Sequence, residues 1–169
     1  LTAMAAAGGG QAGVGGSLAV ATVVGSTRAY VGEGAQVNAR GLGDAASVYT
    51  GETGKTVEAA KGLAVTAYNT ENVVTTDVSG AGGGNTGVAV SLSGNVIANT
   101  AEAYIGRSAK INESNAAAGA EQQVLVKAVN ETVLVNNAGG AGFGGTAGVG
   151  AAINLAVIAK NTRTWIGNG

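Results

Sequence analysis

Two glycine-rich runs have the spacing of a nucleotide-binding fingerprint. Both Gly8-x-Gly10-x-x-Gly13 and Gly82-x-Gly84-x-x-Gly87 match G-x-G-x-x-G. In that fingerprint, the glycines let backbone amides approach a pyrophosphate. It requires a strand before the run, a helix after it and an acidic residue about 20 positions later. Here the residues after each run alternate as a strand does, and a glycine-rich run recurs along the chain. We therefore interpret both runs as structural turns.

The acidic residues are the second candidates for chemistry. Pairs of carboxylates can cleave glycosidic bonds by hydrolysis or elimination, and they can bind calcium. The chain has Asp44, Asp77 and eight glutamates, and no two acidic residues lie within three positions of each other. Glycoside hydrolysis needs two convergent carboxylates, and calcium-binding β-helix repeats place an aspartate after their glycines. Neither pattern is present in the sequence. We expect a non-catalytic protein that uses no metal and no cofactor.

The composition removes further classes of chemistry. The sequence includes no histidine, cysteine or proline, which excludes disulfides, thiol nucleophiles, zinc fingers and Ser-His triads. A net charge of −1 gives no electrostatic footprint for nucleic acid or an anionic membrane. Glycine occurs 31 times, and alanine and valine are also abundant. The positive mean hydropathy of +0.26 distinguishes this chain from most disordered sequences.

The chain is built from repeats. Segments 13–32, 87–106 and 148–167 align without gaps at offsets of 74 and then 61 in the numbering, and segment 63–69 matches 124–130 at an offset of 61. Each of the three long segments opens with Gly-Val and closes with an aromatic residue, a β-branched residue and glycine. The sequence thus predicts one domain of 61-residue repeats at about 5–78, 79–139 and 140–169, the last incomplete. The first repeat carries a 13-residue insertion within 39–61, which we expect to be a loop or an elaborated turn.

Alternation with a period of two predicts strands. Val88, Val90 and Leu92, for example, alternate with Ala89 and Ser91. The parity of the apolar positions changes within each repeat, near residues 23, 97 and 158, which predicts a corner there. Strands of about 5–6 residues would divide each repeat into three coils of a β-solenoid with an apolar lumen. An antiparallel sandwich or barrel is the alternative, but Asn-Gly, a preferred hairpin turn, occurs only at 168–169.

Two columns of the repeat carry large or charged side chains. Tyr30, Tyr104 and Trp165 share one column, as a stripe that contacts a glycan or protein or as a cover for the core. Arg28, Glu102 and Arg163 share another. If each repeat forms three coils, members of a column lie about 14 Å apart. We therefore expect the charged column to be a solvated face without direct ion pairs.

The glycine-rich segment 138–167, AGGAGFGGTAGVGAAINLAVIAKNTRTWIG, resembles repeats of very large bacterial exoproteins. These are the filamentous-haemagglutinin-like adhesins and related autotransporter passengers, and the resemblance extends over essentially the whole chain. It implies a right-handed parallel β-helix, exported by a type V route to the outer surface of the bacterium. The repeats of that family share no functional residues, so the resemblance transfers none to this chain.

The resemblance and the composition together predict a structural shaft segment cut from a larger secreted adhesin. The parent protein would reach a host receptor or glycan through its other parts, and the membrane through its own anchor. Two alternatives stay open. In the first alternative, the chain is a binding module that contacts a host glycan or protein, or that self-associates end to end or laterally into filaments. Less favoured is a β-helical enzyme that acts on polysaccharide.

Overall fold

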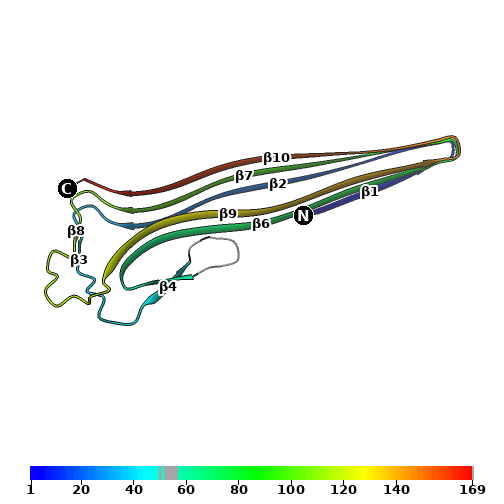
Figure 1. Cartoon of the computed structure of the whole chain (residues 1–169). Coiled ribbons are helices and arrows are strands. Elements are labelled where there is room, and N and C mark those ends of the chain that lie inside the picture. The colour runs from blue at the N-terminus through cyan, green and yellow to red at the C-terminus, as the bar shows by residue number, and fades with distance from the viewer. Residues whose placement is uncertain (50, 52–56, 169) are drawn as a thin grey trace. The chain divides into compact units, whose positions relative to one another are not determined.

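The regular elements of the computed structural model are all strands (Figure 1). The structure describes residues 1–49, 51 and 57–168, and no helix occurs among them. The prediction of an all-β protein is confirmed, and the described residues contain no helix that could cross a membrane. The ten strands are β1 (Thr2–Gly9), β2 (Ala12–Val31), β3 (Gln36–Val37), β4 (Ala46–Tyr49), β5 (Val57–Ala60), β6 (Gly62–Gly83), β7 (Thr86–Ile105), β8 (Lys110–Ile111), β9 (Gln123–Gly144) and β10 (Ala147–Ile166).

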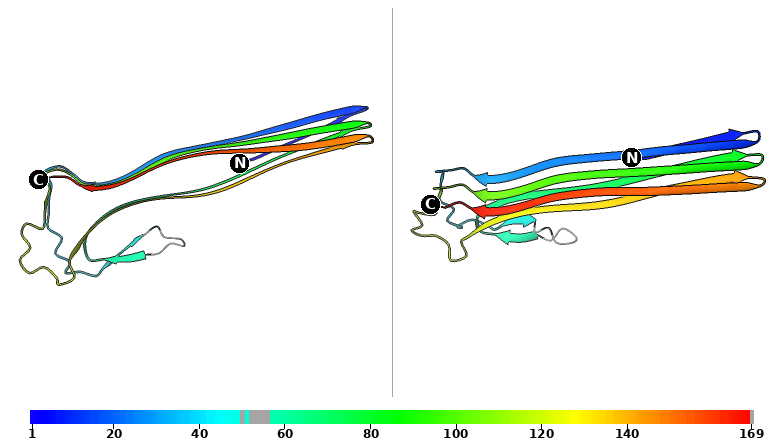
Figure 2. Two further views of the ribbon diagram at one scale, coloured as in Figure 1. Left: turned by 45° about the horizontal axis from the view of Figure 1, so that its top comes forward. Right: turned by 90° about the horizontal axis from the view of Figure 1, so that it is seen from above.

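Strand β1 and the long strands β2, β6, β7, β9 and β10 form two three-stranded sheets, ordered β1-β6-β9 and β10-β7-β2 (Figure 2). Strands that follow one another across a tight turn, such as β6 and β7, belong to different sheets. Neighbours within a sheet come instead from successive repeats. Strand β1 pairs in parallel with β6, from Thr2 opposite Thr76 to Gly9 opposite Gly83. The offset between the first two repeats, which was found in the sequence, is therefore the register of the sheet.

This register corrects the prediction of three coils per repeat. Equivalent residues of successive repeats are direct neighbours in the ladder, so each repeat adds one layer rather than three. The prediction of short strands was the source of the error, because the long strands have 20 to 22 residues. No corner interrupts β2, which is continuous through residue 23.

The chain divides into two compact units, to which all the repeats contribute. Unit 1 comprises residues 1–24, 71–98 and 132–159, and unit 2 comprises residues 25–70, 99–131 and 160–169. Strands β2, β6, β7, β9 and β10 each supply residues to both units.

The interior of unit 1 is lined by small and polar side chains. Along β7, Ala89, Ser91, Ser93 and Asn95 are buried, whereas Val90 and Leu92, which alternate with them, are exposed. The expected lumen of valine, isoleucine, leucine and alanine is therefore wrong in part for this unit. Alanines and Ile97 are buried, but serine and asparagine are buried beside them. The apparent change of parity has the same explanation. Val14, Leu18 and Val20 point outward, whereas Val23, Ala29 and Val31 point inward, along one unbroken pattern of alternation.

Glycines allow the two sheets of unit 1 to approach each other near the turns. A Cβ atom added to the inward-facing Gly15 would overlap the carbonyl oxygen of Gly80, whereas one added to Gly80 itself would meet no atom within 4 Å. The turns also stack on one another through backbone hydrogen bonds. Asn85 N donates to Gln11 O at 2.9 Å, and Thr146 N donates to Asn85 O at 2.9 Å. The glycine-rich runs are thus turns followed by strands, as predicted, and no helix follows them.

Unit 2 contains the short strands. β3 pairs in parallel with β8, again with first-repeat residues opposite their second-repeat equivalents, and β4 pairs with β5 as an antiparallel hairpin. This hairpin lies within the predicted insertion at 39–61, and its central residues 50 and 52–56 lie outside the described part of the chain. The Tyr49 ring of the hairpin stacks on Tyr68 of β6, with ring centroids 5.3 Å apart. The insertion is therefore an elaborated turn anchored by an aromatic contact.

Candidate functional site

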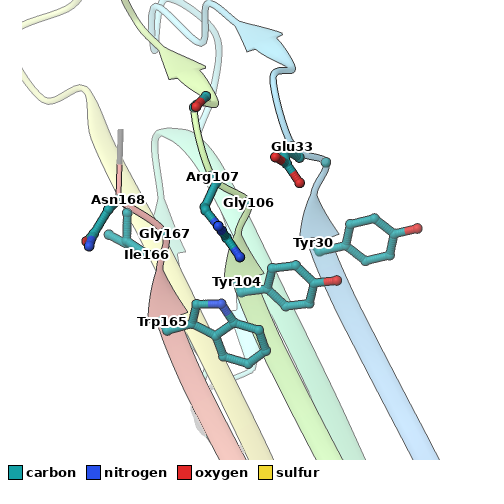
Figure 3. Close-up of a pocket in the computed structure, with 11 residues that line it drawn as sticks. Tyr30, Glu33, Tyr104, Gly106, Arg107, Trp165, Ile166, Gly167 and Asn168 are labelled. Carbon is teal, nitrogen blue, oxygen red and sulfur yellow. The ribbon is translucent and has the colours of Figure 1, made fainter.

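The three aromatic residues that share a column of the repeat form a continuous stack in unit 2 (Figure 3). They come from the ends of β2, β7 and β10, which are adjacent in one sheet. The ring centroids of Tyr30 and Tyr104 lie 5.2 Å apart with an interplanar angle of 10°, and those of Tyr104 and Trp165 lie 4.2 Å apart at 7°. In-register parallel pairing brings equivalent side chains side by side, at about the 4.8 Å strand spacing. The stack follows directly from the repeat.

The stack limits what a ligand could contact. Tyr104 has a neighbouring ring on each face, so its faces are used for packing. Tyr30 and Trp165 are the outer members, and these residues remain 59% and 40% exposed. Any stacking contact with a sugar or a protein would therefore use the outer rings or the edges of the stack. The prediction that these residues bind a partner stays a prediction.

An open cleft of about 740 Å³ lies beside the aromatic stack (Figure 3). The loop residues after the three strands line it together with the rings, and Glu33 and Arg107 are its two charged lining residues. The ladder continues through these loops, because Gly106 N donates to Val31 O at 2.8 Å and Gly167 N donates to Ile105 O at 2.8 Å. The cleft thus combines aromatic, cationic and anionic groups on a backbone fixed by hydrogen bonds.

The charged column contradicts the expectation that its members cannot pair. Arg28 Nε and Nη2 each lie 2.9 Å from Glu102 Oε2, although the two residues are 74 positions apart. The physical reason is the single layer per repeat, which places them on adjacent strands rather than about 14 Å apart. The third member, Arg163, donates from Nε to Asn161 Oδ1 at 2.9 Å.

Two further contacts in unit 2 change the pKa of their members. Tyr68 Oη donates to Glu131 Oε2 at 2.9 Å. This hydrogen bond raises the pKa of Tyr68 above its ordinary value of 10.0, and a hydrogen bond with Thr70 opposes it. Lys61 Nζ lies 2.9 Å from Glu121 Oε2. Its hydrogen bond and positive charge lower the pKa of Glu121 below the ordinary value of 4.5. Both contacts join successive repeats.

Unit 1 holds a buried polar cluster that the sequence analysis did not identify. Thr75 Oγ1 donates to Asn95 Oδ1 at 2.7 Å, and Ser91 Oγ donates to Ser79 Oγ at 3.0 Å. Asp77 lies on β6 between Thr75 and Ser79 and is fully buried. Neither of its carboxylate oxygens has a hydrogen-bond partner among the described residues. The signal was the alternation of serine and asparagine with valine and leucine. It fits either face of a sheet, and the apolar residues were assigned to the inside.

The described residues contain no group of three or more histidine, cysteine, aspartate or glutamate side chains that could hold a metal ion. Searches with protein-family models, against curated proteins and against solved structures gave no match to the chain. The aromatic stack with its cleft in unit 2 and the buried polar cluster in unit 1 are therefore characterised by their geometry alone.

Proposed function

We propose that the chain is a non-catalytic shaft segment of a secreted bacterial surface adhesin, folded as a right-handed parallel β-solenoid with one layer per repeat. The parent protein would be exported by a type V route and stand on the outer surface. Its other parts would bind the host receptor or glycan, and its own anchor would attach it to the membrane.

The observation that carries this proposal is the in-register parallel pairing of successive repeats. Each repeat contributes one strand to each long sheet, and its turn hydrogen-bonds to the turn of the next repeat. Such layers add by nearest-neighbour contacts, so a repeat protein of this kind extends without a change in plan. A shaft needs this property, because its length is set by the number of repeats.

The number of repeats can be varied to test the proposed shaft. Inserting a second copy of residues 87–147 after residue 147 adds one complete repeat. We expect it to add one layer, to raise the midpoint of urea unfolding and to keep the far-ultraviolet circular dichroism of a β protein. An inserted repeat that is digested by protease as rapidly as an unfolded chain would contradict the proposal. Surface labelling of intact source cells with an antibody against the chain tests its location.

The cleft beside the aromatic stack supports a second candidate function, a binding module for a glycan. Its charged residues, Glu33 and Arg107, can hydrogen-bond sugar hydroxyls, and Trp165 presents an aromatic surface. A glycan array probed with the chain and with Arg107→Ala tests this function. A ligand that is bound by the chain and lost in the variant would support a binding module over a shaft without ligands.

A further inference from the structure

The two units differ sharply in their charged side chains. None of the nine lysines and arginines lies in unit 1, all of whose residues the structure describes. Its two charged side chains are Glu71 and the fully buried Asp77. The outer faces of this unit therefore carry no cationic side chain and little negative charge. Such a surface is unusual for a protein that faces water on all sides.

One outer face of unit 1 is almost entirely apolar. We call it the apolar face, and it consists of the outward positions of β2 and β7 within 12–24 and 86–98, together with their repeat equivalents in β10 within 147–159. Thr22 and Thr86 are its two polar residues. Three strands of thirteen residues cover roughly 600 Å², given the usual strand spacing and rise. Its exposed large side chains include Leu18, Val24, Leu92, Ile153, Leu155 and Val157.

The apolar face is not flat, because projecting side chains lie beside glycines. The exposed Leu18 and Leu92 occupy the same column on adjacent strands, and each is two residues from an outward-facing glycine, Gly16 and Gly94 respectively. A Cβ atom added to Gly16 would meet only Val90 O at 3.6 Å, and one added to Gly94 only a methyl group of Val20 at 3.9 Å. Both glycines are therefore shallow hollows beside projecting leucines.

We propose that the apolar face pairs with the same face of a second copy of this chain. In a two-fold arrangement, the leucines of one copy fill the glycine hollows of the other, because an isologous interface must be self-complementary. Burying roughly 600 Å² on each copy gives about 1,200 Å² in total, which reaches the lower end of stable protein interfaces. The pairing requires only this face and does not depend on the proposed shaft function.

The structure favours a protein partner over a lipid bilayer. Unit 1 has no lysine or arginine, so it has no cationic side chain to attract lipid head groups, whereas helices that bind a membrane surface are rich in these residues. A second copy can cover the face without any cationic side chain.

The test measures the mass of the whole chain by sedimentation velocity over a concentration series. We expect a dimer for the chain itself and at least a tenfold higher dissociation constant for Leu92→Glu. Val78→Glu is the matched control, because Leu92 and Val78 are both 42% exposed on central strands and Val78 lies on the outer face of the other sheet. The control should remain dimeric. A monomeric chain, or equal effects of the two variants, would overturn the proposal.

Gly94→Leu distinguishes a complementary interface from non-specific hydrophobic association. It adds apolar surface but fills the hollow, so a complementary interface predicts weaker dimers, whereas non-specific association predicts stronger ones. Circular dichroism and the melting temperature must stay close to those of the chain in every variant. Flotation with phosphatidylcholine vesicles tests the lipid alternative. Binding to vesicles that Leu92→Glu abolishes, from a chain that is monomeric in solution, would also overturn the proposal.

Discussion

Arg28 and Glu102 form an ion pair at 2.9 Å across adjacent strands, although they are 74 positions apart in the sequence. The side chain of Arg28 is 54% exposed and that of Glu102 is 12% exposed. An ion pair with a partner in water contributes at most about 1 kcal/mol, so it does not determine the fold. Its value is as a marker of register. The same offset relates the stacked Tyr30 and Tyr104, and the backbone ladder of β1 and β6.

Replacing the buried Asp77 should stabilise the protein. The equivalent positions of the neighbouring repeats are Ala3 and Ala138, and a buried polar group without a partner costs about 1–3 kcal/mol. We expect Asp77→Ala to raise the free energy of unfolding by about that amount, measured by urea denaturation. Asp44→Ala is the control, because Asp44 is exposed and its loss should change stability by less than about 0.5 kcal/mol. A loss of stability in Asp77→Ala would show that the carboxylate has a stabilising partner.

A methyl group at Gly15 should force the sheets of unit 1 apart. Its Cβ would overlap the carbonyl oxygen of Gly80, so Gly15→Ala should cost about 1–3 kcal/mol, as overpacking does elsewhere. Gly80→Ala is matched to it, because a Cβ there meets nothing within 4 Å. This control should leave the protein as stable or more stable, since glycine weakens a strand interior. Equal thermal midpoints for the two variants would mean that the sheets are not held so close together.

The middle ring should dominate the aromatic stack. Tyr104→Ala removes two stacked contacts, each worth about 0.5–1.5 kcal/mol, and we expect a loss of about 1–3 kcal/mol in urea unfolding. The fluorescence of Trp165 should shift to the red, because its ring loses its neighbour. Tyr104→Phe keeps the ring and should behave like the unchanged protein. Retained stability and an unshifted emission in Tyr104→Ala would argue that the rings do not stack in solution.

Tyr68 should give the protein a dependence on alkaline pH. Its pKa is raised in the folded state by the hydrogen bond to Glu131. A raised pKa in the folded state stabilises the fold below the pKa of the unfolded chain, and this contribution is lost as the pH rises through the higher folded value. We expect Glu131→Gln to lower the pKa of Tyr68 toward 10.0. The pKa of Tyr68 is measured as the difference between the ultraviolet absorbance titrations of the protein with and without Tyr68→Phe. An unchanged pKa in Glu131→Gln would exclude Glu131 as the cause.

The repeat and its offsets were the most informative part of the sequence, because in-register pairing makes equivalent residues touch. Alternation also identified these segments as strands, although it did not give their length. What the sequence did not reveal was which face points inward. Apolar residues were expected to line the interior, but Val14, Leu18 and Val20 are exposed, and serine and asparagine are buried in unit 1 beside alanine. Alternation with a period of two does not tell which face of a strand is buried. That depends on the side on which the second sheet packs.

The number of layers per repeat was wrong for a related reason. A 61-residue repeat fits three short coils or one pair of long strands equally well, and typical strand lengths favoured the first. The aromatic column was found from spacing alone, yet its stacking could not be, because stacking requires adjacent layers. The repeat equivalents of Asp77 are alanines, which indicated that its position faces the interior, but this signal was overlooked.

The central claim is that each repeat forms one layer, with Arg28 directly beside Glu102. The chain has no cysteine, so the double variant Arg28→Cys/Glu102→Cys tests this claim without interference. Adjacent parallel strands place the Cα atoms about 4.8 Å apart, within the range for a disulfide. Mild oxidation of the dilute protein, followed by mass spectrometry, should give an intrachain disulfide in high yield. Arg28→Cys/Thr100→Cys, shifted by two residues, should give little. No disulfide between positions 28 and 102, or an equal yield from both pairs, would contradict the account.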